Sequence, residues 1–146
     1  MSRQVTVEED ALQASLAAEH AAVFGYGVVG GRIVGVAPAS FWQGLAVASY
    51  DAHRDLRDRL VTTISRLGGT PVSAEPAYDL PTRVDNLRSC QQLARMVESR
   101  CAAVHAAAVA VTVPARRSLV AKALSESAVR GVRWEARVAA LPGIDG

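Results

Sequence analysis

Three ionisable side chains, Glu19, His53 and Glu98, fall where the helical pattern predicts a dry interior. Apolar and small residues recur at helical spacing on the Glu19 side of its segment: Leu12, Leu16, Val23, Tyr26, Gly30 and Ile33. A carboxylate buried without a partner is costly, so Glu19 must meet a cation, a metal, a proton or strong donors. Two carboxylates and one imidazole suit a single iron or manganese ion, and zinc less well.

Four long helices are predicted to position these side chains. The first begins at a capping box of Thr6 and Glu9 and runs to about Val34. The second begins at Ser40 and ends at Gly68-Gly69, the third is capped by Asp85 and runs to about Thr112, and the fourth follows Val113-Pro114 and runs to about Ala140. In the first helix Gly25, Gly27, Gly30 and Gly31 indicate either a break in the helix or close approach of a neighbouring backbone, and close approach is favoured.

The segment from Thr70 to Val84 carries three prolines and no helical period. Extended, it reaches roughly 50 Å, enough to run the length of a helix. The third helix is therefore expected to start at the end of the molecule where the second began. Two hairpins joined by such a link predict an all-α, ferritin-like antiparallel four-helix bundle with a long crossover between helices 2 and 3, in one domain over residues 1–146.

The composition narrows the class of protein. Half of the residues are hydrophobic and 5% are aromatic, which favours packed helices, and the formal charge of +2 indicates no strong field for nucleic acid. The sequence shows no membrane-spanning run and no signal peptide, so a cytoplasmic protein is expected. Cys90 and Cys101 are predicted to be buried free thiols. The apolar composition favours a homodimer.

The depth of each side chain along the bundle axis can be estimated by counting residues from the turns. Glu19, His53 and Glu98 fall at one depth near mid-bundle, and the fourth helix places Ser127, next to Glu126, at that depth. Bundles that hold two metals are built in this way, with a Glu from two helices and Glu-x-x-His from the other two.

Four stretches carry a family resemblance: AAEHAAVFGYGVVG, YDAHRDLRDRL, CAAVHAA and AVRGVRW. They resemble a ferritin-like family of unknown function that is typical of actinomycete bacteria, and the resemblance covers nearly the whole chain. It implies the bundle fold and supplies almost no function.

The chain departs from the two-metal pattern. The nearest equivalents of Glu-x-x-His are the stretches from Asp51 to Arg54 and from Glu126 to Val129, and neither has histidine in the last place. Asp51 faces outward by helical phase, and Glu126 lies on a charged face where it is expected to pair with Arg130. The inward candidates are Glu19, His53, Glu98 and His105, but His105 is too far from Glu98 to share an ion with it.

These residues leave three classes of function. The favoured one is a bundle with a degenerate or absent metal site and a structural or interaction role, without catalytic or cofactor-binding residues and without a cofactor. The second is an iron- or manganese-dependent oxidoreductase or iron-handling protein that uses Glu19, His53 and Glu98 as ligands, with Glu126 as a weak fourth. The third is an anion- or nucleic-acid-binding module that uses the basic arc of the fourth helix: Arg116, Lys122, Arg130, Arg133 and Arg137. A solvated face is the simpler account of that arc.

Overall fold

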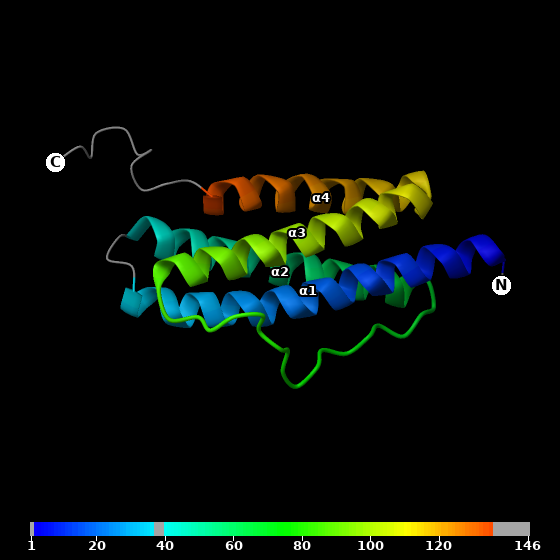
Figure 1. Cartoon of the computed structure of the whole chain (residues 1–146). Helices are drawn as coiled ribbons and strands as arrows, with labels where there is room; N and C mark the ends of the chain where they lie inside the picture. Colours follow the sequence, from blue (N-terminus) through cyan, green and yellow to red (C-terminus); the bar gives the residue numbers. More distant parts are fainter. Residues whose placement is uncertain (1, 37–39, 136–146) are drawn as a thin grey trace.

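The computed structural model describes residues 2–36 and 40–135, and it is a bundle of four α-helices (Figure 1). They are α1 (Arg3–Val36), α2 (Ser40–Arg66), α3 (Leu87–Val111) and α4 (Pro114–Glu135). After α2 the chain runs back along the bundle, so α2 and α3 begin at the same end (Figure 1). The predicted four-helix bundle with one long crossover between α2 and α3 is confirmed. Within the described ranges, no helix is long and apolar enough to cross a membrane.

The helix ends are set by local hydrogen bonds that the sequence predicted in part. α1 begins at Arg3, so the predicted capping box at Thr6 is wrong. Asn86, not Asp85, caps α3, and its side chain accepts a hydrogen bond from the Ser89 amide at 2.8 Å. At the end of α2, Gly68 has φ +84° and the Gly69 amide donates to Ile64 O, a left-handed cap that glycine favours. The predicted end of the fourth helix near Ala140 lies outside the described residues.

The crossover is fastened to α1 by side chains of that helix. Gln13 donates to Thr70 O at 2.7 Å and accepts from the Val72 amide at 2.8 Å. A ring nitrogen of His20 contacts Val72 O at 2.9 Å, which places His20 at the margin of the bundle. The crossover therefore has a defined course over α1.

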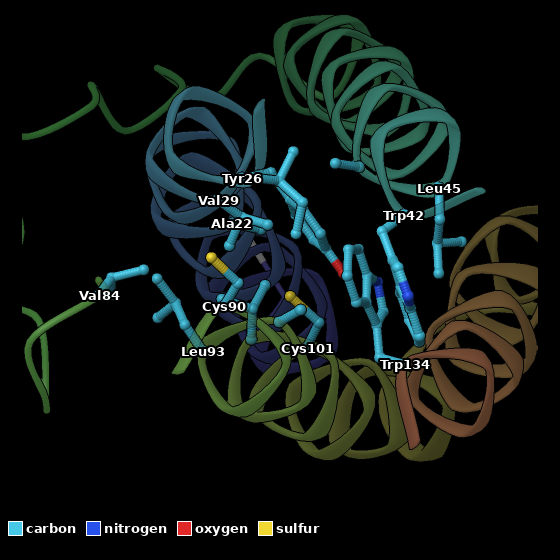
Figure 2. Packing of buried hydrophobic residues seen from close by; sticks show 14 residues of the cluster. Ala22, Tyr26, Val29, Trp42, Leu45, Val84, Cys90, Leu93, Cys101 and Trp134 are labelled. Carbon is cyan, nitrogen blue, oxygen red and sulfur yellow. The ribbon is translucent and has the colours of Figure 1, made fainter. Parts of the chain in front are cut away.

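Two buried apolar clusters fill the bundle on either side of a polar middle. One contains Tyr26, Trp42 and Trp134, and the two indole rings stack with centroids 5.6 Å apart (Figure 2). The other cluster is aliphatic and includes Leu12 and Leu60. Because packed side chains surround the middle, a charge placed there has little access to water.

The glycines of α1 differ in what lies beside them. A Cβ at Gly25 would lie 3.0 Å from Val97 Cγ2, so the Val97 side chain of α3, and not the α3 backbone, packs against Gly25. A Cβ at Gly27, Gly30 or Gly31 would meet no atom within 4 Å. The predicted close approach of a neighbouring backbone is therefore wrong at these four glycines, and Gly25 instead makes room for a side chain of α3.

A candidate centre built from buried ion pairs

Each of the four helices contributes a charged side chain to the middle of the bundle. Glu19 comes from α1, His53 from α2, Glu98 from α3 and Arg130 from α4. Glu19 and His53 are fully buried and Glu98 is 1% exposed. We call these four residues, which hydrogen bonds join to one another, the ion network.

His53 bridges the two carboxylates. Its Nδ1 lies 2.5 Å from Glu19 Oε2 and its Nε2 lies 2.9 Å from Glu98 Oε1. Both ring nitrogens can donate only in the imidazolium form. Burial by itself lowers the pKa of His53, but the hydrogen bonds and charges of both carboxylates outweigh burial and raise it to about 9. His53 is therefore a cation at neutral pH.

Glu98 is the acceptor on which three donors converge. Its Oε1 accepts from the Tyr26 hydroxyl at 2.6 Å and from Arg130 Nε at 2.9 Å, besides the contact from His53. Burial raises the pKa of Glu98, but the bond and charge of His53 and the charge of Arg130 outweigh it, so the pKa falls. Burial and the nearby Glu98 raise the pKa of Tyr26, so its hydroxyl stays protonated and donates.

Glu19 has a second imidazole on its other oxygen. His105 Nε2 lies 2.7 Å from Glu19 Oε1, and His105 Nδ1 lies 3.1 Å from Ser15 Oγ. Burial raises the pKa of Glu19, but the bonds from His105 and His53 outweigh burial and lower it to about 2. Glu19 and Glu98 are thus both anions, and His53 and Arg130 balance them with two positive charges.

The structure assembles Glu19, His53 and Glu98 as the sequence predicted, and it leaves Glu126 outside. Glu126 is exposed on α4 and lies 3.7 Å from Lys122 Nζ. The expected pairing of Glu126 with Arg130 is wrong, because the Arg130 side chain turns inward to Glu98. His105 does not reach Glu98 and contacts Glu19 instead.

The register of the two Glu-x-x-His positions also differs from the prediction by one residue. His53 is the imidazole at the centre, so the glutamate position of a Glu-x-x-His motif on α2 falls three residues earlier, at Tyr50. On α4 the residues that face the centre are Ser127, which is fully buried, and Arg130, whose Nη2 lies 3.4 Å from Ser127 Oγ. The chain therefore has Tyr-x-x-His on α2 and Ser-x-x-Arg on α4.

Sequence reasoning missed the place of Cys101. It is buried and free as predicted, but one donor atom each of Glu19, His53 and Cys101 lies within 4.8 Å of the others, a spacing that could hold one metal ion. Burial, followed by the charges of Glu19 and Glu98, raises the pKa of Cys101 well above its ordinary value, so it stays a thiol. The signal was the spacing Glu98-x-x-Cys101, which puts both side chains on one helix face.

The donor set does not fit a two-metal centre. Tyr50 and Ser127 stand where that arrangement needs glutamates, and Arg130 brings a permanent positive charge where it needs a histidine. Both nitrogens of His53 are already engaged by carboxylates, so neither offers a lone pair to an ion. The set Glu19, His53 and Cys101 fits one metal only if His53 and Cys101 both lose a proton.

Comparison with known proteins agrees with this architecture. The family model described as a domain of unknown function (DUF4439) matches residues 11–146. The chain belongs to the DUF4439 family. A conserved hypothetical protein from Mycobacterium tuberculosis, rv2844, is 30% identical, with 95% of each chain covered and a TM-score of 0.84. The predicted resemblance to a ferritin-like family of unknown function is supported, and the actinomycete source stays a prediction.

Two more distant structures share the fold of this DUF4439 protein. A ferritin-like diiron-carboxylate protein from Bacillus anthracis str. Ames is 19% identical, with a TM-score of 0.69 and coverage of 92% of this chain and 95% of that one. A dodecameric thioferritin from Bacteroides fragilis, described as bacterioferritin-related, is 21% identical, with a TM-score of 0.76 and coverage of 90% and 83%. No curated protein matches the chain.

Proposed function

We propose that this DUF4439 protein is a metal-independent member of the ferritin-like fold with a structural or interaction role. In this proposal the ion network takes the place of a metal centre and holds the four helices together. The observation that carries the proposal is the ion pair between Arg130 and Glu98, in which Arg130 Nε lies 2.9 Å from Glu98 Oε1. The guanidinium supplies the positive charge that a metal would otherwise supply.

Charge balance supports the proposal. Two carboxylates inside a bundle repel each other unless cations neutralise them, and His53 and Arg130 do so without any added ion. A metal ion added to this set would place more positive charge beside Arg130, which cannot lose its proton. Metal binding would therefore have to displace both the imidazolium proton and the guanidinium.

Elemental analysis of the purified protein tests the proposal. We expect iron, manganese and zinc well below one ion per chain, both as isolated and after incubation with each metal followed by desalting. Chelator treatment should leave the thermal unfolding midpoint unchanged. One ion of a single metal bound per chain, and lost in Glu19→Ala, would overturn the proposal.

A mononuclear metal site is the second candidate, and the closeness of Glu19, His53 and Cys101 favours it. Iron, manganese or zinc at this place would serve an oxidoreductase or iron-handling role; the thiol favours zinc or iron over manganese. Cobalt(II) distinguishes the candidates, since a thiolate ligand gives an intense charge-transfer absorption. That absorption, present in the wild type and lost in Cys101→Ser, would support the second candidate.

An anion-binding role for the basic arc of α4 remains the third candidate. Two of its members have internal partners, because Arg116 pairs with the buried Glu8 and Arg130 pairs with Glu98. Arg133 is exposed, and Arg137 lies outside the described residues. Salt-dependent binding to DNA that weakens in Arg133→Glu would support this role. A homodimer also remains a proposal, and the mass in solution tests it.

A further inference from the structure

A pocket of about 480 Å³ opens between α1 and α3. Its α1 wall is made mostly of small residues, among them Ala14, Ala18, Ala21 and Gly25, and Phe24 is the one large side chain of that helix that lines it. We call it the α1–α3 pocket. Its volume lies in the range of pockets that enclose small organic molecules, and its walls are mostly apolar, as in such pockets.

The crossover closes one side of the α1–α3 pocket. Tyr78 and Leu80 line it, and the Tyr78 ring packs against Phe24 of α1 with centroids 5.4 Å apart. The hydrogen bonds of Gln13 fasten the start of the crossover to α1. The pocket is therefore formed before any ligand arrives, which lowers the entropy cost of binding.

The two charged residues that line the α1–α3 pocket are Arg100 on α3 and Asp79 on the crossover, and both are exposed. Neither makes an ion pair within residues 2–36 and 40–135. Arg100 extends from a regular helix and offers a fork of donors that matches a carboxylate. Asp79 repels a negatively charged ligand, so Arg100 is expected to strengthen the binding of a carboxylate and Asp79 to weaken it.

We propose that the α1–α3 pocket binds a small amphiphilic carboxylate. Its apolar body lies between the alanines of α1 and Met96, and its carboxylate meets Arg100 at the rim. The pocket also reaches Cys101, so the ligand would lie beside the centre without using its ion pairs. The proposal goes beyond the metal-independent role and does not depend on it, because no residue of the ion network lines the pocket.

Decanoate below its micelle-forming concentration is a suitable probe, measured by isothermal titration calorimetry on the full chain. We expect one site per chain. Arg100→Gln should weaken binding about tenfold, the effect of losing one charge-assisted contact of roughly 1.4 kcal/mol. Asp79→Asn should tighten binding. Decanol and decylamine should bind more weakly than decanoate.

Matched variants separate the pocket from unspecific binding. Ala103 is an exposed residue that lines the pocket, so Ala103→Phe should fill it and abolish binding, whereas Ala107→Phe on the same helix should not. Arg88→Gln, which removes an exposed arginine outside the pocket, should also leave binding unchanged. Circular dichroism would confirm that each variant is folded. Absent decanoate binding, tighter binding of decylamine, or full binding in folded Ala103→Phe would each overturn the proposal.

Discussion

Arg130 Nε lies 2.9 Å from Glu98 Oε1, the same oxygen that His53 and Tyr26 contact. This ion pair joins α4 to α3 inside the bundle. Without the guanidinium, Glu98 would keep its negative charge in a nearly dry site with one cation fewer. The pair therefore makes Arg130 a structural residue, in contrast to a surface arginine.

We predict that Arg130→Met lowers the free energy of unfolding by about 3 kcal/mol, because breaking a buried ion pair leaves the other charge uncompensated. Urea unfolding measures it. Arg133→Met is the matched control, since Arg133 is exposed on the same helix, and it should change stability by less than about 0.5 kcal/mol. Adding Glu98→Gln to Arg130→Met should cost less than the sum of the two single changes. Equal losses in the two arginine variants would contradict the ion network.

The pH dependence of stability follows from the shifts of His53 and Glu19. The pKa of His53 rises from 6.5 to about 9. The contribution of His53 to the free energy of unfolding is therefore complete below pH 6.5 and disappears as the pH rises through 9. The pKa of Glu19 falls from 4.5 to about 2, so its contribution is complete above pH 4.5 and disappears as the pH falls toward 2. We expect the free energy of unfolding to be constant between about pH 4.5 and 6.5 and to decline at lower and at higher pH.

The ionisable groups that face His53 are Glu19, Glu98, the Tyr26 ring and, within 4.8 Å, Cys101. Because burial raises the pKa values of Tyr26 and Cys101, the alkaline decline belongs to this one imidazole. Chemical unfolding at a series of pH values measures the effect. His53→Gln should remove the decline between pH 6.5 and 9. If the decline persists unchanged in this variant, His53 is not the cation of the centre.

Much of the architecture was predictable because it depends on periodicity and length. Glu19, His53 and Glu98 came together as predicted since residues on a helix stripe keep their depth when helices pack antiparallel. The direction of the long Arg130 side chain was not predictable, because an arginine at the edge of a stripe can reach either water or the interior. The register of Tyr50 and Ser127 as the Glu positions of the two motifs was missed for a different reason: it depends on helix rotation, which counting from the turns does not fix.

Tyr26 donates the shortest of the bonds to Glu98. We predict that Tyr26→Phe lowers the free energy of unfolding by about 2 kcal/mol, since the lost bond is to a charged acceptor. The apolar packing of the ring against Trp134 is kept. Tyr50→Phe is the control, and thermal unfolding compares the two. A loss in Tyr50→Phe as large as that in Tyr26→Phe would contradict the assignment.

Glu8 forms a second buried ion pair at the turn between α3 and α4. It accepts from Arg116 Nε and Nη2 at 2.8 Å each and from the Val113 amide at 3.1 Å. The bond from Arg116 lowers the pKa of Glu8. We predict that Glu8→Gln costs about 2 kcal/mol in urea unfolding, whereas the exposed Asp10→Asn costs almost nothing. Because this pair lies apart from the centre, its loss should add to that of Arg130→Met.

The residues that exclude two metals can be changed together. Tyr50→Glu, Ser127→Glu and Arg130→His would restore Glu-x-x-His on α2 and α4 while Glu19 and Glu98 remain. We predict that this triple variant binds two manganese or cobalt ions per chain and unfolds at a higher temperature with metal than without it. The double variant that keeps Arg130 should bind fewer ions, because the guanidinium remains in the site. Elemental analysis and thermal unfolding measure both effects. If the folded triple variant binds no more metal than the wild type, then the packing of the helices, and not the exchanged side chains, keeps metal out.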